Sequence, residues 1–546
     1  MRSSIFRFHK GDHIGTASAE DDTEFLSKCY VDTGELAILK DIKDNHVIVL
    51  GRTGTGKSAL LKRLAEVEGD QAIFISPESL ALAHVSNSTI LNFFADLGVN
   101  LDPFFKLLWR HVFTVEILSR HFAGRDTDSR KTFWEKITAM FMSESRTDKK
   151  MREALDYLNH WGKSFWLETE YRIKEITKTL ETKLDAEIKA SIDISGASLA
   201  AGEKATDALT LSEKGELRAR GQKVVAEAQV QDLHHVMDIL DRVLDDRQKR
   251  YFILIDGLDE NWVEERLRYR FIMALILTAR EFIRIRNAKV ILALRRDLID
   301  RVFRLARDAG FQEEKYRSLY LQMSWSSKQL IEVLNRRISA LVSRRYTKQT
   351  VTHLDLLPKQ FNKVPISEYI LTITTTPRDI IALFNECIAV ATEQRRITAS
   401  AMKTALGQYS RLRLRALGDE WSADYPALLD FAKILQNRSV SFKLSTMVDS
   451  DIQQLCLDIC AADPGGDCIL KRNAMGVVDC LKTAAEFKIF LMQVFYLTGL
   501  VGLKLAQHEK PSWAGDRGSS VSSAEITPDV SVVVHPKYHR ALGIRP

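Results

Sequence analysis

The chain has 546 residues, of which 45% are hydrophobic and 27% are charged, and its formal net charge is +6. This length allows two to four domains with buried cores, and so mild a charge permits a nucleic-acid partner without requiring one. The absence of an apolar run of 18 residues argues against a membrane partner, and the start of the chain has no secretory pattern. Six cysteines in so long a chain indicate reduced thiols, and we therefore expect a cytoplasmic protein.

Residues 1–45 predict a helical lead-in. A helical pattern that begins near Glu20 places Phe25, Leu26, Cys29 and Tyr30 on one face, and residues 36–42 predict a second short helix. The short apolar run from Val47 to Leu50 then predicts a buried parallel strand.

A phosphate-binding loop follows this strand. The sequence G-x-x-x-x-G-K-S begins at Gly51, and an amphipathic helix runs on from Ser58 to about Glu66. Glycines let the backbone turn sharply and bring its N–H groups close to phosphate oxygens, while the helix adds its positive end. Lys57 can reach the β- and γ-phosphates, and the Ser58 hydroxyl can bind Mg²⁺. The predicted nucleotide-binding residues of this loop are Gly51, Arg52, Thr53, Gly54, Thr55, Gly56, Lys57, Ser58 and Ala59.

A large insertion separates the next two strands. Residues 72–76 predict a short strand, and about 175 residues then precede the next strong one, far more than an ordinary crossover needs. The elements predicted inside it are an aromatic-rich core helix at 91–122, charged helices at 168–189 and 216–250, and short strands at 190–195 and 207–212. Such a hairpin arm suits assembly or partner contact, or it is a solvated spacer.

A Walker B strand follows the insertion. The apolar run from Tyr251 ends in Asp256, and the segment continues as D-G-L-D-E. Asp256 can hold Mg²⁺ through water, and either Asp259 or Glu260 can orient or deprotonate an attacking water. With Lys57, these two carboxylates are the candidate catalytic residues, and an acidic loop after a buried strand is the simpler alternative.

Two further strands complete the predicted sheet. Residues 290–294 form an apolar run that ends at Arg295 and Arg296, which either sense the γ-phosphate or are merely solvated. Residues 319–323 predict the last core strand, after which Ser327 is predicted to cap a helix that runs to Val342. Apolar strands that alternate with crossovers predict a parallel sheet between helices, with ligands at the carboxyl ends of its strands. Gly51, Asp256 and Arg295 all fall at such ends.

The Thr-Pro-Arg-Asp segment at residues 376–379 predicts the start of a helix that extends to about Ala391. Thr376 can cap this helix, and Pro377 suits its first turn. Arg378 is a second candidate sensor, or else an exposed arginine at a helix start.

The last part of the chain, from about Arg411, predicts a winged helix. A helix at 486–497 and strands at 499–505 and 530–535 surround a Gly/Ser-rich segment at 512–523, which predicts a flexible wing tip. A winged helix can enter a DNA groove or dock a protein, and the lack of a dense Lys/Arg patch favours docking. The four cysteines of this region are buried free thiols in our interpretation, because their spacing is not that of a zinc site: Cys456, Cys460, Cys468 and Cys480.

The sequence therefore predicts an α/β fold: an ASCE-type P-loop NTPase sheet between helices, with a large helical insertion and a C-terminal winged-helix-like domain. The predicted domains are a lead-in at 1–45, an ATPase core at 46–84 and 246–345, the insertion at 85–245, a helical lid or sensor domain at 346–410, and the C-terminal domain at 411–546.

These motifs together resemble the STAND and KAP-like group of bacterial P-loop ATPases, which are often encoded in antiviral defence or mobile-element loci. Their order is similar to that of the Orc/Cdc6 branch of AAA+ proteins. The resemblance covers residues 20–80 and 250–400, and it implies ATP and Mg²⁺ as cofactors, slow hydrolysis and nucleotide-gated assembly into a homo-oligomer. The arm at 85–245 exceeds a minimal core, so assembly geometry does not transfer. Because the chain has no recognisable nuclease, protease or NAD-cleaving motif, a role in defence implies a separate effector protein.

Three hypotheses follow from the sequence. The first is an ATPase switch that controls assembly and a partner effector. The second is a DNA-binding initiator or mobile-element ATPase whose winged helix contacts duplex DNA. The third is a scaffold that holds nucleotide without turnover.

Overall fold

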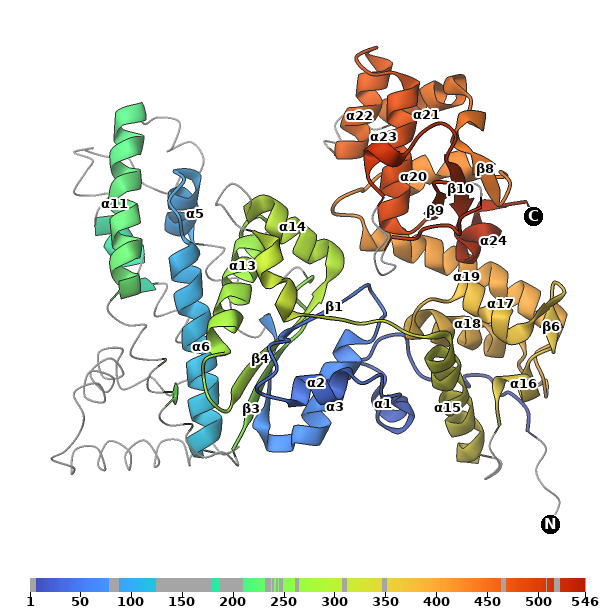
Figure 1. The fold of residues 1–546 in the computed structure, drawn as a ribbon, viewed down its shortest axis with the longest axis horizontal. Helices are drawn as coiled ribbons and strands as arrows, with labels where there is room; N and C mark the ends of the chain where they lie inside the picture. Colours follow the sequence, from blue (N-terminus) through green and yellow to red (C-terminus); the bar gives the residue numbers. More distant parts are fainter. Residues whose placement is uncertain are drawn as a thin grey trace. The chain divides into compact units, whose positions relative to one another are not determined.

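The computed structural model describes residues 6–77, 88–123, 178–179, 181–186, 210–230, 237, 240–241, 244, 249–260, 265–306, 312–345, 351–462, 468–506, 508–514 and 521–545. The chain forms two compact units (Figure 1). We call residues 32–324 the sheet unit, and residues 1–31 with 325–546 the helical unit. None of the described helices combines the length and apolar character that crossing a membrane requires.

The sheet unit is built on five parallel strands in the order β2-β3-β4-β1-β5. Their bounds are β1 Ile48–Gly51, β2 Ala72–Ile75, β3 Tyr251–Ile255, β4 Ala288–Arg295 and β5 Tyr320–Gln322. Strands β1 and β3 are buried along their whole length, as expected for parallel strands covered on both faces. The predicted α/β class and all five predicted strands are therefore confirmed. In this order β4 separates the P-loop strand from the Walker B strand.

Helices cover both faces of this sheet. Helices α6 and α13 lie on one side and helices α2 and α3 on the other (Figure 1). The bounds of the α-helices are α2 Glu35–Lys40, α3 Lys57–Glu68, α5 Thr89–Asp96, α6 Asp102–Ala123, α11 Leu211–Val230, α13 Glu265–Phe282 and α14 Arg296–Ala306. The described part of this unit also contains the 3₁₀ helices η1 Gly69–Gln71 and η4 Glu313–Leu319.

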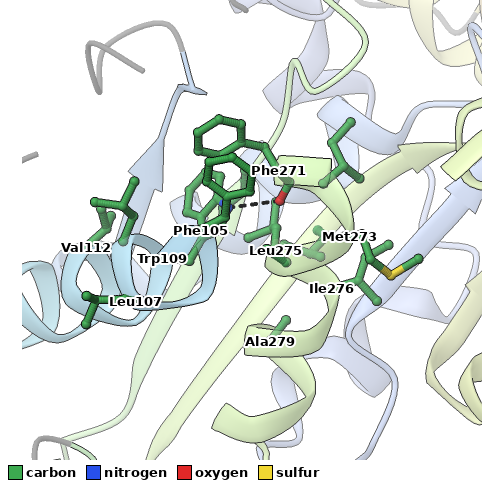
Figure 2. Packing of buried hydrophobic residues seen from close by; sticks show 14 of the residues in the cluster. Phe105, Leu107, Trp109, Val112, Phe271, Met273, Leu275, Ile276 and Ala279 are labelled. Atoms are coloured by element: carbon green, nitrogen blue, oxygen red, sulfur yellow. Dashed lines mark hydrogen bonds between the residues drawn. The ribbon is translucent and has the colours of Figure 1, made fainter. Parts of the chain in front are cut away.

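The aromatic residues that the structure describes between 93 and 113 belong to the core, as predicted. The Trp109 indole N–H donates to the Phe271 carbonyl at 3.0 Å, and the rings of Phe105 and Phe271 stack with centroids 4.2 Å apart (Figure 2). This hydrogen bond satisfies a buried donor, because Trp109 is 1% exposed. The contact fixes α6 against α13.

The single helix predicted at 91–122 is instead two helices. Gly98 adopts a φ of +78°, a left-handed conformation that ends a helix. The Val99 N–H then closes α5 by donating to the Phe94 carbonyl at 2.9 Å. The Asn100 side chain accepts from the Asp102 N–H at 3.0 Å where α6 begins. The apolar periodicity continues across this break, which explains why the sequence pattern missed it.

The arm is described only in part. Residues 178–179 and 181–186 are helical, in agreement with the first charged helix, whereas the strand predicted at 190–195 lies outside the described residues. The second charged helix begins at Leu211, earlier than predicted, so the strand predicted at 207–212 is wrong for its last two residues. Gly221 of α11 packs so closely on the Phe94 ring that a Cβ would lie 2.6 Å from it. The alternation of apolar and polar residues at 207–212 thus did not distinguish a strand from the start of a helix.

The helical unit has one core made by its amino-terminal residues and helices α15–α19, and a second core farther along the chain. The bounds of its first half are α1 Thr23–Cys29, α15 Ser327–Arg345, α16 His353–Leu356, β6 Gln360–Phe361, β7 Val364–Pro365, α17 Ile366–Ile373, α18 Pro377–Val390 and α19 Ala399–Glu420. Of the four residues predicted to share one face here, Phe25 and Cys29 are buried, whereas Leu26 and Tyr30 are half-buried. Helix α15, expected in the ATPase core, belongs to this unit, and α19 runs straight through the boundary expected at residue 411.

Two helix caps can be compared with their predictions. Thr376 caps α18 as expected, since its side chain accepts from the Asp379 N–H at 3.2 Å. Helix α15 is capped by Ser326 rather than Ser327. The Ser326 hydroxyl accepts from the Gln329 N–H at 3.3 Å, while the Gln329 side chain accepts from the Ser326 N–H at 2.8 Å. This reciprocal pair is a capping box, which needs Gln three residues after the cap.

The C-terminal part has winged-helix order. A three-stranded sheet, β8-β10-β9, is antiparallel, and α23 leads directly into β9. The bounds are α20 Leu428–Ala432, η5 Lys433–Leu435, β8 Ser441–Lys443, η6 Leu444–Thr446, α21 Asp449–Ala462, α22 Ile469–Val478, α23 Ala484–Thr498, β9 Val501–Lys504, η7 Ser523–Glu525, β10 Ser531–Val534, η8 Pro536–Tyr538 and α24 His539–Leu542. The predicted helix–strand–loop–strand order is confirmed.

Two expectations about this region need correction. Part of the predicted flexible tip has regular structure, because Ser512 pairs with Leu503 and Ser522 precedes a short 3₁₀ helix. Three of the four cysteines are buried free thiols, as interpreted, but Cys480 is exposed. Cys480 follows α22 with a φ of +58°, in a turn that leaves the apolar face.

Candidate functional site

The loop after β1 is shaped by glycines in left-handed conformations. Gly54 and Gly56 have φ values of +82° and +92°. A Cβ on Gly51 would lie 2.3 Å from the Thr55 hydroxyl oxygen, so that position has no room for a side chain. The Thr55 hydroxyl in turn donates to the Arg52 carbonyl at 2.8 Å, which holds the loop in a tight curl. The loop therefore has the compact form that phosphate-binding loops require.

Lys57 lies at the first position of α3, immediately after the left-handed Gly56. Its ammonium group donates to the carbonyls of Gly51 and Arg52, at 3.2 Å in each case. These two hydrogen bonds hold the Lys57 ammonium group over the start of the loop. Ser58 and Ala59 follow in the first turn of α3, where helix N–H groups lack partners within the helix. One positive charge, a hydroxyl and several amides thus converge at one helix start.

The Walker B segment ends in a sharp turn. Asp256 follows β3, and its side chain accepts from the Gly257 N–H at 3.0 Å. Gly257 has a φ of +74°, and the Glu260 N–H then donates to the Gly257 carbonyl at 3.2 Å. The Arg268 side chain donates to the Glu260 carbonyl at 3.0 Å from below this turn. Asp259 and Glu260 are thereby presented together after the strand end.

The P-loop and Asp256 lie at the same edge of the sheet. Gly51 is in register with Arg295 at the end of β4, and Ile255 is in register with Leu292 of the same strand. Only β4 lies between β1 and β3, and two strand spacings amount to about 10 Å. The predicted convergence of the P-loop, Asp256 and Arg295 on the carboxyl edge is thus confirmed.

The two candidate arginine sensors have different surroundings. Arg295 binds Asp297 through two nitrogens, Nε at 3.1 Å and Nη2 at 2.8 Å, and its Nη1 contacts Asp259 at 3.4 Å. Arg296 instead pairs with Asp300 at 3.1 Å and with Glu313 at 3.4 Å. Burial raises the pKa of Asp300 to about 6, although Arg296 opposes the shift. Arg295 is therefore connected to the Walker B turn, and Arg296 to carboxylates of α14 and η4.

Arg378, the third candidate sensor, belongs to the helical unit. Its Nε donates to the Ala17 carbonyl at 3.0 Å, and burial lowers its pKa. Its role toward a nucleotide stays a prediction.

The structure makes two acidic residues conspicuous: the sequence pattern assigned Asp297 no role, and it assigned Asp379 only a favourable interaction with the dipole of its helix. Asp297 forms a bidentate ion pair with Arg295, and Asp379 is a fully buried carboxylate in the helical unit. An aspartate two residues after a candidate sensor was visible in the sequence, but only the fold shows that it faces that arginine. Among the described residues, no cluster of three His, Cys, Asp or Glu side chains gathers as a metal site, and the cysteines form none there.

Comparison with known proteins finds a similarity to a recognised domain in part of the helical unit. Residues 328–418, which begin within α15 and end within α19, match the FunZ-associated C-terminal helical domain. The chain is also 33% identical over 120 residues to the putative transposon gamma-delta 80.3 kDa protein of Escherichia coli strain K12. That match spans 20% of this chain and only 16% of the relative.

Among solved structures, a Walker-type ATPase of Pyrococcus abyssi is similar, with a TM-score of 0.34 and 13% sequence identity. The match covers 92% of this chain and 95% of that one. At this level of similarity, the assignment of the P-loop fold depends on the strand order and loop geometry of the chain itself.

Proposed function

We propose that the chain is a P-loop ATPase that acts as a nucleotide-dependent switch. The observation that carries the proposal is the convergence of the P-loop, Lys57, Asp256 and the Asp259–Glu260 turn at one sheet edge. The donors fit a nucleoside triphosphate with Mg²⁺, because amides and an ammonium group suit phosphate oxygens while hydroxyl and carboxylate oxygens suit magnesium. The crowded Gly51 supports the same fit, since the Thr55 side chain occupies the space that a Cβ at this position would need.

In this proposal the P-loop amides and Lys57 hold the phosphates, and Ser58 and Asp256 hold Mg²⁺, which supplies charge neutralisation when bound. Glu260 orients and deprotonates water in our assignment, because Asp259 already contacts Arg295. Arg295 and Arg378 are sensors. Arg296 is the weaker candidate, because its carboxylate partners lie in α14 and η4 and not in the Walker B turn.

We further propose that nucleotide state controls assembly of this chain with itself and with a separate effector protein. The support is the organisation of the chain: the P-loop and Walker B residues are joined to a large insertion and a winged-helix-like part, in which the sequence has no recognisable catalytic motif. The antiviral role follows only from the resemblance to STAND and KAP-like ATPases.

Replacement of Lys57 tests the site. We expect Lys57→Ala to weaken equilibrium binding of ATP with Mg²⁺ by at least about 30-fold, the size of one or two charge-assisted hydrogen bonds. Lys43→Ala is the matched control, because Lys43 is an exposed lysine of the same unit that precedes β1. Calorimetric titration of both variants with ATP measures the effect. Full affinity in Lys57→Ala would refute the assignment.

A second candidate function is a DNA-dependent ATPase of mobile elements. It is favoured by the similarity to the transposon protein and by the winged-helix order of β8–β10. Titration of the full chain with duplex DNA over a range of salt concentrations separates the two. Affinity that falls steeply with salt indicates phosphate contacts and supports this second function. A scaffold without turnover is the outcome if nucleotide binds but no phosphate is released under any of these conditions.

A further inference from the structure

Arg295 is held between two carboxylates of unequal character. Asp297 takes two of its nitrogens at 3.1 and 2.8 Å, and Asp259 takes the third at 3.4 Å. The Asp297 side chain is 19% exposed and the Asp259 side chain is 41% exposed, while that of Arg295 is 14% exposed. The two-point ion pair with Asp297 is therefore the shorter and less solvent-exposed contact.

The supports of the two carboxylates differ as well. Asp297 lies in the first turn of α14, so its backbone is fixed by the helix that continues from β4. Asp259 lies in the short turn after β3, which ties itself together through the Gly257 carbonyl. The contact with Asp259 is single, longer and more exposed, so it costs less to break than the two contacts with Asp297. The contact with Asp259 is thus the one that can exchange.

We propose that Asp297 is a positioning residue for Arg295, and that Asp259 competes with the terminal phosphate of a bound nucleoside triphosphate for Nη1 of Arg295. This inference rests on the proposed function. It is supported by the register of Arg295 with Gly51, which starts the arginine side chain beside the phosphate-binding loop. An anionic phosphate oxygen and a carboxylate oxygen are equivalent partners for a guanidinium N–H.

The competition lets the site distinguish a nucleoside triphosphate from a diphosphate. A diphosphate lacks the group that reaches Nη1, so Asp259 keeps its contact with Arg295. A triphosphate takes the nitrogen and releases Asp259, together with the turn that carries Glu260. Occupancy of the nucleotide site is thereby converted into a change in the Walker B turn, without any new residue entering the site.

The test compares binding of ADP and of a non-hydrolysable ATP analogue, both with Mg²⁺, to the full chain. The ratio of the two affinities isolates contacts to the terminal phosphate and needs no turnover. We expect Asp259→Asn to raise the preference for the triphosphate by about threefold to fivefold, the size of an exposed ion pair. Asp300→Asn is the matched control, because Asp300 contacts Arg296 rather than Arg295.

Asp297→Asn should lower the preference for the triphosphate over ADP by at least about threefold, because the guanidinium loses the charged carboxylate that positions it. The effect of each substitution should vanish when it is combined with Arg295→Ala, since both act through that arginine. A merely structural role for Asp297 would lower the thermal midpoint and leave the preference unchanged.

Two results would overturn the inference while the proposed function stands: equal effects of Asp259→Asn and Asp300→Asn, or an effect of Asp259→Asn that persists in the Arg295→Ala background. Wild-type protein that binds neither nucleotide would instead remove the proposed function itself, and the inference with it.

Discussion

Replacing Asp379 with asparagine should strongly destabilise the helical unit. The Asp379 side chain is 1% exposed and lies 3.0 Å from Nε of Arg413 and 3.6 Å from Nζ of Lys537. Arg413 is in α19 and Lys537 is in η8, so a single carboxylate joins the start of α18 to the C-terminal part of the chain. Asparagine keeps the shape of the side chain and leaves both cations without their buried counter-charge.

The magnitude can be worked out in two ways. Removal of one member of a buried ion pair typically costs about 3–5 kcal/mol. Burial by itself raises the pKa of Asp379, but Lys537 and Arg413 outweigh it and lower the pKa to about 2 from a reference of 3.8. That shift corresponds to roughly 2 kcal/mol, at about 1.4 kcal/mol per pKa unit. The first figure is larger because the substitution also leaves the two cations buried and unpaired.

The pH dependence has a definite sign. Because the folded-state pKa lies below the unfolded one, the unfolded chain binds the proton first as the pH falls. The stability that Asp379 contributes is therefore fully present above about pH 4 and is lost as the pH approaches 2. The difference between wild type and Asp379→Asn should stay constant from pH 7 to pH 5 and shrink below pH 4.

Hydrogen exchange is the suitable assay, because a chain with two units does not unfold in one step. We expect amide protection in residues 377–390 and 531–542 to fall together, by about 100-fold or more for a loss of 3 kcal/mol. Asp430→Asn is the matched control, since Asp430 pairs with Lys433 on the surface and both side chains are more than half exposed. Equal protection in the two variants would refute the reasoning, as would a difference that disappears between pH 7 and pH 5.

Two further substitutions test the packing of the sheet unit. Gly51→Ala places a Cβ 2.3 Å from the Thr55 hydroxyl and so distorts the loop. Nucleotide affinity, measured by titration, should fall at least about tenfold. The distortion should cost about 1–3 kcal/mol of stability, measured by thermal unfolding. Trp109→Phe leaves the buried Phe271 carbonyl without its donor and should cost about 1–3 kcal/mol, seen as faster hydrogen exchange in α13; unchanged exchange would contradict the packing described.

The sequence was sufficient for the sheet and its carboxyl edge because each strand is a short apolar run, and three of the five runs end at a residue that suits a nucleotide site. Gly51, Asp256 and Arg295 could be placed at one edge without knowledge of strand order, since parallel strands share their carboxyl ends. The P-loop geometry followed in the same way, because only glycine adopts the φ values that Gly54 and Gly56 show.

What the sequence missed depends on partners that are distant in the chain. Arg295 and Arg296 are adjacent and chemically identical, and only the positions of Asp259 and Glu313 show that they face different surroundings. Asp379 has the local pattern of an ordinary first-turn acid, which favours a helix dipole at any exposure. Its burial against Lys537 comes from the packing of the C-terminal part, and the neighbouring residues in the sequence do not indicate this burial.

The position of Asp379 also constrains how a switch can work. Arg378, a candidate sensor, is the neighbouring residue on α18, so a movement of Arg378 that follows nucleotide state displaces Asp379 as well. Breaking the buried contacts with Arg413 and Lys537 would cost about 3–5 kcal/mol. A nucleotide that couples two sites typically supplies only about 1–3 kcal/mol. Within the helical unit, α18 and the C-terminal part are therefore expected to move as one body, with the mobile joint elsewhere in the chain.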